Sequence, residues 1–317
     1  MTYQSAAISN DLSSLPKLPD WVTSGRAETL DTVAFRSGAT LTVLGQLVSD
    51  PRHGVPVKLL ASRLALSAAT ATSKLEGRLA READIRDAYH LTPPGETRGP
   101  DGDLLAFWRE AVRLRLGGPG EIADLVGADF AREVGIWLDT GLERARTHGP
   151  LAGCMVVLQA VLQADDRAER VACLLSDLVL TRVLNWKTVL PVSARRLTKS
   201  ALRDLNAKGQ GAELAVQARI LESIEETIQL ARDLARRAKA LRTVAPKLRA
   251  KGSDAAVDLF LTEDAIAPAS MLSPYIYGTT IPMTSRAARR FCDRLVELGV
   301  ARELTGRPTF RLYGIAP

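Results

Sequence analysis

Residues 212–242 contain neither glycine nor proline, and this uninterrupted segment constrains the fold more than any other part of the chain. As one helix it would be about 45 Å long, at 1.5 Å per residue. Its apolar residues form a narrow seam of the kind that packs along another helix: Leu214, Leu221, Ile224, Ile228, Ala231, Ala235 and Ala238. The change from Leu and Ile to Ala indicates closer packing toward the C-terminal end. We expect partner helices within the chain, with a dimer seam as the alternative.

Most of the remaining chain also repeats its apolar residues at helical spacing. The segments concerned are 27–47, with an interruption at Gly38, then 57–78, 104–116, 130–146, 151–164 and 167–186. Residues 91–102 are rich in Pro and Gly, so we expect an exposed loop there, and a second break at 117–120. The sequence therefore predicts a mainly α fold with a body of many helices.

The cysteines and the first residues of the chain bear on the cellular compartment of the protein. Cys154, Cys173 and Cys292 are far apart, odd in number and set in apolar surroundings, which favours buried thiols over disulfides or a zinc site. The first residues lack a basic segment followed by an apolar stretch, and the longest apolar run, 151–162, is too short to cross a bilayer. We expect a cytoplasmic protein without a metal or a cofactor.

The C-terminal region has the order of a recognition helix followed by a wing. Residues 284–299 begin with the capping hydroxyl of Thr284 and end at Gly299, with apolar residues on one face. Residues 300–313 then alternate as two short strands around a turn at 305–309. Upstream, two segments can supply supporting helices, namely 255–261 and 268–277.

The stretch TSRAARRFCDRLVELGVARELTGRPTFRLYG resembles the winged helix-turn-helix units that close many bacterial regulators and Fic-type proteins. The resemblance implies a C-terminal winged helix with a short β-hairpin. We therefore expect an N-terminal arm at 1–25, anchored by Trp21, a helical body at 26–250 and a winged helix-turn-helix domain at 253–317. In such units the first half of the helix enters the major groove of DNA.

Basic residues of this unit are the first candidate DNA contacts. Arg286, Arg289 and Arg290 share one helix face beside Ser285, and Arg307 lies in the wing turn. Guanidinium groups can pair with guanine edges or clamp phosphates. The alternatives are a protein-binding surface and a solvated helix face that serves only packing. Asp293 and Glu297, on the same helix, would repel phosphate.

A second basic surface precedes the winged helix. The net charge of the chain is +6, yet residues 190–251 alone hold 14 Lys and Arg against 6 Asp and Glu. Arg232, Arg236 and Lys239 form a stripe at helical spacing, which could follow a phosphate backbone together with the later basic residues Arg242, Lys247, Arg249 and Lys251. The alternative is a solvated face. Base-stacking aromatics are missing from this stretch, which argues against binding of single strands.

Catalytic signatures are weak. Residues 72–77, TSKLEG, are similar to the motif of the inhibitory helix in Fic-type adenylyltransferases, whose glutamate corresponds to Glu76. None of the histidines, His53, His90 or His148, lies in the His-Pro-Phe loop that such an enzyme needs. Glu76 is then a helix-end ion pair or a relic of nucleotide regulation. Phosphate loops and metal-ligand spacings are also missing, so we predict no catalytic residues, although histidines could still converge in space.

Over its full length the chain resembles an uncharacterised alphaproteobacterial family that is often plasmid-borne. GRAETLDTVAFRSGA, RLALSAATATSKLEGR and LRTVAPKLRAKGSDAAVDLFLTEDAIAP carry this resemblance together with the C-terminal ending. The favoured function is binding of double-stranded DNA. The protein would then act as a regulator, of transcription for example, or as a maintenance factor of a plasmid or mobile element. A homodimer is expected with it, since symmetric DNA readers are usually dimers. A helical protein-interaction scaffold and a degenerate Fic-like nucleotide-binding protein remain alternatives.

Overall fold

The computed structural model describes residues 15–25, 28–93, 95–114, 119–207, 209–248, 251–307 and 309–315. Within these residues the chain is mainly helical, as predicted, with one two-stranded antiparallel hairpin near its C-terminal end. The α-helices are α1 (Asp20–Thr23), α2 (Leu30–Ser49), α3 (Val57–Leu75), α4 (Glu82–His90), α5 (Gly99–Ala111), α6 (Pro119–Val126), α7 (Val134–His148), α8 (Pro150–Ala164), α9 (Glu169–Val183), α10 (Lys199–Ala207), α11 (Gln210–Val244), α12 (Ser253–Phe260) and α13 (Ser285–Glu297). Short helical turns and strands complete the description: η2 (Pro51–His53), η3 (Ala194–Arg196), η4 (Ala245–Lys247), η5 (Pro268–Leu272), β1 (Ala301–Glu303) and β2 (Tyr313–Ile315).

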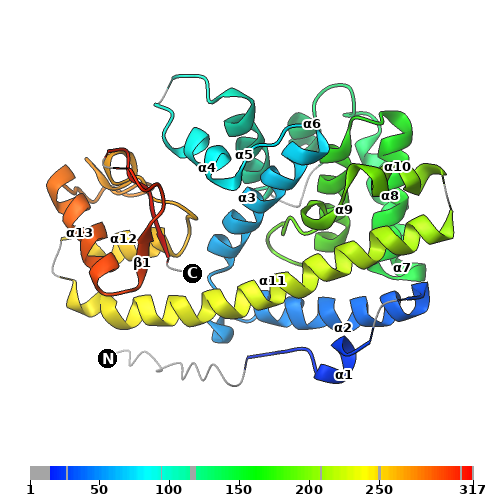
Figure 1. Ribbon diagram of the computed structural model, residues 1–317, viewed down its shortest axis with the longest axis horizontal. Coiled ribbons are helices and arrows are strands. Elements are labelled where there is room, and N and C mark those ends of the chain that lie inside the picture. The colour runs from blue at the N-terminus through cyan, green and yellow to red at the C-terminus, as the bar shows by residue number, and fades with distance from the viewer. Residues whose placement is uncertain are drawn as a thin grey trace.

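Helix α11 runs without interruption for 35 residues along the long axis of the molecule (Figure 1). Helix α2 lies beside it in the same direction: Arg36 pairs with Glu225 at 2.7 Å, and Arg242 approaches the carbonyl of Gly54, just after α2. The predicted seam faces the protein interior, since all its residues are buried except Leu214, which is half-buried. The prediction of one long helix packed on a helix of the same chain is confirmed.

Two predicted interruptions of helices are wrong. Helix α2 continues through Gly38, where a glycine lowers helix stability but does not forbid the helix. The loop expected at 91–102 ends earlier, because α5 begins at Gly99. Pro100 stands in its first turn, where the missing N–H has no helical partner to lose and the fixed φ suits the helix.

The N-terminal segment is held by residues other than Trp21. Leu15 and Val22 are buried, whereas the Trp21 side chain is 68% exposed. The centroids of the Trp21 and Phe35 rings lie 5.9 Å apart. Arg232 donates hydrogen bonds to the carbonyls of Leu15 and Pro16, each at 2.7 Å. The prediction that Trp21 anchors the arm is therefore wrong, and residues 1–14 of that arm lie outside the described part of the chain.

A winged-helix unit occupies the end of the molecule where α11 finishes (Figure 1). Helix α12 leads to Ile266, which forms an antiparallel bridge with Tyr313, and β1 pairs with β2 in the register Arg302 opposite Gly314. The hairpin packs against α13. The first supporting helix is confirmed. The second, predicted at 268–277, is only the five-residue turn η5, because Ser273 is extended before Pro274, which lacks the N–H a helix needs.

The apolar core passes from the body into the winged-helix unit. Buried residues of α12, α13 and β2, among them Phe260, Phe291 and Ile315, belong to the same hydrophobic cluster as the core of the body. The three cysteines are buried in it as free thiols, as predicted. None of the described helices is long and apolar enough to span a membrane.

Candidate nucleic-acid interface

Helix α13 is strongly amphipathic, and its two ends are set by local chemistry. Its inner face buries Ala288, Phe291, Cys292 and Leu295 against the core. The hydroxyl of Thr284 accepts a hydrogen bond from the N–H of Ala287 at the start, which satisfies one of the free donors there. Gly299 follows the helix with φ of +70°, a conformation that suits glycine. The helix predicted at 284–299 is therefore confirmed, with its hydroxyl cap and its terminal glycine.

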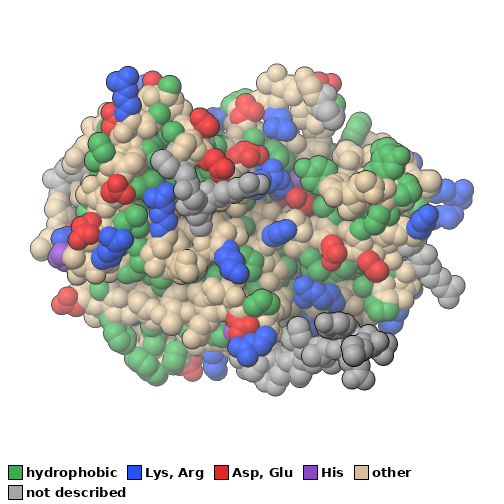
Figure 2. All heavy atoms as spheres, turned by 180° about the vertical axis from the view of Figure 1, so that it is seen from behind, with side chains coloured by type: hydrophobic (Ala, Val, Ile, Leu, Met, Phe, Trp, Pro, Cys, Tyr) green, Lys and Arg blue, Asp and Glu red, His purple; other side chains and the backbone are tan. Residues whose placement is uncertain are grey.

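The residues that the sequence singles out on α13 lie on its solvent side. Ser285, Arg286, Arg289 and Arg290 are all exposed, and Lys and Arg side chains stand at the edge of the molecule that the winged-helix unit forms (Figure 2). Ser285 is within 3.0 Å of the hydroxyl of Ser273, and the Arg289 side chain turns back to the carbonyl of Ser285. Among the described residues, Arg286 and Arg290 form no ion pair with a carboxylate.

A groove of about 640 Å³ lies between α13 and the turn η4 that ends the long helix. Its cationic lining comes from two elements, with Lys247 on η4 and Arg286, Arg290 and Arg294 on α13. The C-terminal end of the second basic surface thus meets the basic face of α13, whereas Arg232, Arg236 and Lys239 do not line this groove. Arg294 is not among the predicted contacts, although the i, i+4, i+8 spacing from Arg286 through Arg290 to Arg294 is a signal that could have found it.

The acidic residues of α13 have partners within the protein. Asp293 accepts a hydrogen bond from the hydroxyl of Tyr313 at 3.1 Å, and Glu297 pairs with Arg294 at 2.8 Å. These interactions offset part of the negative charge that would face a phosphate. The exposed pair of Glu297 and Arg294 is nevertheless weak in water, so Arg294 is not withdrawn from the groove.

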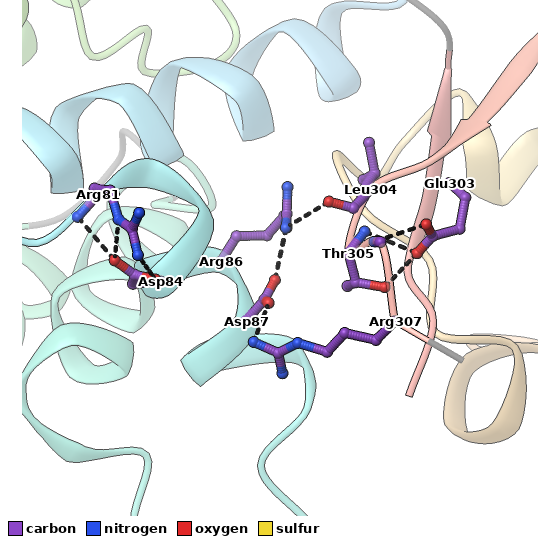
Figure 3. Close-up of polar contacts among 9 residues, drawn as sticks. Arg81, Asp84, Arg86, Asp87, Glu303, Leu304, Thr305 and Arg307 are labelled. Carbon is purple, nitrogen blue, oxygen red and sulfur yellow. Dashed lines mark hydrogen bonds and ion pairs between the residues drawn. The ribbon is translucent and has the colours of Figure 1, made fainter. Parts of the chain in front are cut away.

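The wing lies against α4 (Figure 3). Arg86 donates to the carbonyl of Leu304 at 3.1 Å, and Arg307 reaches the carboxylate of Asp87 at 3.4 Å. Within the wing, Glu303 accepts from the N–H groups of Thr305 and Gly306, each at 2.8 Å. The Arg307 side chain is still 58% exposed. Pro308 of the predicted turn lies outside the described residues.

Some of the basic side chains in the stripe on α11 are engaged in contacts within the protein. Arg232 is engaged with the N-terminal segment, and Arg236 shares the carboxylate of Asp233 with Arg237. Arg236 and Lys239 are exposed, whereas Arg232 is half-buried. Of the later basic residues, Lys247 lines the groove, and Arg249 lies outside the described residues. The structure therefore places Arg232 at an internal contact, apart from the other two candidates.

The body side of the winged-helix unit holds a buried ionic cluster that no sequence pattern predicted. Arg109 of α5 pairs with Glu263 and, at 2.7 Å, with Asp264, and all three side chains are almost fully buried. The imidazole of His90 lies 3.6 Å from Asp264, which is too far for a hydrogen bond, and the two form an ion pair only when the ring is protonated. The partners are more than 150 residues apart in sequence, so no local pattern could have revealed them.

Burial and charge act in opposite directions in this cluster. Burial alone would raise the pKa of Asp264, but the nearby His90 and the guanidinium of Arg109 outweigh it and lower that pKa to about 2. Burial would likewise lower the pKa of Arg109, while the charges of Asp264 and Glu263 raise it above its usual value. Two further bonds dock the unit, from Ser62 to the carbonyl of Thr262 and from Arg63 to that of Ile315.

Asp177, whose pKa is shifted, and Glu76, which the sequence singled out, make contacts within the helical body. Burial raises the pKa of Asp177 to about 7, although this carboxyl accepts hydrogen bonds from Val192 and Ser193 and so fixes their loop on α9. Glu76 ends α3 and pairs with Arg78 at 2.8 Å and with Arg170 at 3.4 Å. Among the described residues, no group of three His, Cys, Asp or Glu could hold a metal ion.

The fold and this surface define a class: a helical protein with a C-terminal winged-helix unit that docks on the body through buried ion pairs and presents a basic helix to solvent. A family model described as a protein of unknown function, DUF1403, matches residues 6–315. The chain belongs to the DUF1403 family, whose model covers both the helical body and the winged-helix unit. No curated protein matches the chain.

Proposed function

We propose that the protein binds double-stranded DNA and that α13 is the helix that enters the major groove. The observation that carries this proposal is the groove in which Lys247 joins Arg286, Arg290 and Arg294. Two elements far apart in sequence converge there with four cations, and the apolar residues of α13 face the core, so the basic side is free to meet a ligand. Arginine forks match phosphate oxygens and guanine edges better than most other ligands.

Each basic residue has a defined role in this proposal. Arg286 and Arg290, beside Ser285, approach base edges or the flanking phosphates, and Arg289 reaches the backbone next to them. Lys247 and Arg294 neutralise phosphates along the groove, and the exposed Arg236 and Lys239 extend the basic surface along α11. Arg307 of the wing adds a phosphate contact only where it can leave Asp87.

Fluorescence anisotropy with a random-sequence duplex and with fragments of the protein's own replicon tests the proposal directly. Across about 50 to 200 mM salt, affinity should fall steeply, with a slope near −0.9 for each phosphate neutralised. One fragment should bind more tightly than the random duplex if the arginines read base edges. A chain that binds no duplex even at the lowest salt is not a DNA-binding protein of this kind.

A role in plasmid or mobile-element biology follows from the resemblance to a family that is often plasmid-borne. We propose that the protein regulates or maintains such an element. Binding to replicon fragments in preference to unrelated duplex supports this role, whereas equal binding to both leaves only a general DNA-binding protein. Sedimentation of the free and the DNA-bound chain tests the expected homodimer, because two copies on one palindromic site should sediment as a dimer.

A protein-interaction scaffold is the second candidate, and the docked wing favours it. The contacts of Arg307 with Asp87 and of Arg86 with Leu304 use the wing for packing within the chain (Figure 3). A scaffold needs no exposed cations on α13, however, and Arg286, Arg289 and Arg290 are not covered by the body. Loss of salt-dependent duplex binding together with capture of a defined protein partner would favour the scaffold.

A further inference from the structure

A short turn of chain, residues 275–282, lies beside the start of α13 and exposes two tyrosine side chains. Tyr275 bridges to Pro282, and the N–H of Ile276 donates to the carbonyl of Ile281 at 3.0 Å, so the segment forms a small hairpin. Gly278 turns it with φ of +74°. We call residues 275–282 the tyrosine hairpin, since Tyr275 and Tyr277 are each 58% exposed.

The inner side of the tyrosine hairpin is fixed to the winged-helix unit. Ile276 is fully buried. The hairpin fits closely over Gly252, where an added Cβ would lie 2.7 Å from Ile281 and 2.9 Å from Ile276. At its base, the N–H of Met283 donates to the carbonyl of Pro274 at 2.9 Å, and Ser273 meets Ser285 of α13. The hairpin therefore has a fixed position beside the first turn of α13.

The outer side of the tyrosine hairpin is uncharged and rich in hydroxyl groups. Tyr275 lies at the base of the tyrosine hairpin and Tyr277 in its turn, which the N–H of Thr279 closes on the carbonyl of Ile276 at 2.9 Å, and both rings are exposed. Thr279 and Thr280 follow at the turn, and residues 271–283 contain no charged side chain. Neutral hydroxyl donors next to a row of arginines suit a sugar-phosphate backbone, where Tyr and Thr are common partners of phosphate oxygens.

We propose that the tyrosine hairpin is a second, uncharged contact to the DNA that α13 reads, an inference that rests on the proposed function. Tyr275 and Tyr277 donate their hydroxyls to phosphate oxygens on one side of the major groove and pack their rings on the adjoining sugars. The contact displaces no counterion, because a tyrosine carries no charge to replace one. It adds affinity and fixes the register of α13 without adding salt dependence.

Anisotropy titrations of the full chain with a random-sequence duplex, repeated across the salt range, test this inference. The change from Tyr275 and Tyr277 to Ala should lower affinity on the order of tenfold at every salt concentration, as the removal of two hydrogen bonds predicts. The slope of log affinity against log salt should stay at the wild-type value. Tyr275→Phe with Tyr277→Phe keeps the rings and should retain part of the affinity that the Ala variant loses.

Phe35→Ala is the matched control, because Phe35 is also 58% exposed and lies on α2 in the helical body. It should bind as the wild type, and all variants should unfold at the wild-type temperature, since the altered side chains are exposed. If the wild type binds with steep salt dependence while the Tyr-to-Ala variant binds equally well, the hairpin contact is wrong and the proposed function stands. A reduced slope in that variant also overturns the inference, and a wild type that binds no duplex overturns both.

Discussion

The two sides of the winged-helix unit carry similar charged residues and use them in opposite ways. On the body side, Arg109 meets Glu263 and Asp264 out of contact with water, whereas on the outer side Arg286 and Arg290 are exposed without a carboxylate partner among the described residues. Removing one member of a buried pair leaves an uncompensated charge, while removing an exposed cation leaves only solvent. The inner side should therefore control stability, and the outer side should control ligand affinity.

The largest expected effect is at Arg109. Arg109→Met leaves the carboxylates of Glu263 and Asp264 buried without their cation, so the free energy of unfolding should fall by about 3 to 5 kcal/mol. Denaturant unfolding followed by circular dichroism measures this decrease. Arg113→Met is the matched control, because Arg113 lies one turn further along the chain with an exposed side chain and should change stability by less than about 0.5 kcal/mol. Equal effects of the two changes would contradict the comparison.

The outer side should show the reverse pattern. Arg286→Ala with Arg290→Ala should lower affinity for a duplex by about tenfold or more and reduce the salt slope by about 0.9 for each phosphate that the variant no longer neutralises. Stability should stay within about 0.5 kcal/mol of the wild type, since both side chains are exposed. Arg289→Ala should cost less, because Arg289 does not line the groove.

Arg146→Ala with Arg203→Ala removes the same charge from exposed positions on α7 and α10. This control separates a specific surface from the overall charge of the protein. If both double variants weaken binding equally, α13 is not the contact surface, and the contrast between the two sides of the unit does not concern DNA.

The free energy of unfolding at acid pH should depend on the ionic cluster on the inner side of the unit. The pKa of Asp264 is lowered to about 2 from an ordinary value of 3.8, so its contribution is complete above about pH 4 and is lost as the pH falls toward 2. The shift corresponds to about 2 kcal/mol. The difference in unfolding free energy between the wild type and Asp264→Asn should therefore shrink between pH 4 and pH 2.

Asp177→Asn serves as the control for this titration. The pKa of Asp177 is raised to about 7, so this carboxyl is protonated below pH 4 in the folded chain and is not the source of the acid loss. A difference between wild type and Asp264→Asn that stays constant from pH 5 to pH 2 would show that the Asp264 carboxylate is not held by Arg109 and His90 in solution.

Local patterns in the sequence predict several parts of this fold. The seam of α11 lies within one continuous stretch of chain, as do the apolar face, the hydroxyl cap and the final glycine of α13, and all were predicted. The ionic cluster was not, because it joins residues of α4 and α5 to Glu263 and Asp264 through tertiary packing. The groove was predicted in part. The basic residues after α11 and those on α13 were both identified, but the position of Lys247 beside α13 depends on tertiary packing at the end of α11.

The smallest expected effect is at the wing, where the two sides of the unit meet. Arg307→Ala breaks a half-exposed pair with Asp87, so stability should fall by at most about 1 kcal/mol. Duplex affinity should fall less than for Arg286→Ala, since the Arg307 guanidinium is already engaged with Asp87. Asp87→Asn weakens that pair and removes a negative charge, so it should raise affinity slightly through a freed Arg307, while the loss of the more buried pair of Asp87 with Arg86 at 2.7 Å should lower stability. If Arg307→Ala instead costs as much affinity as Arg286→Ala, the wing leaves α4 when DNA binds and belongs with the outer side.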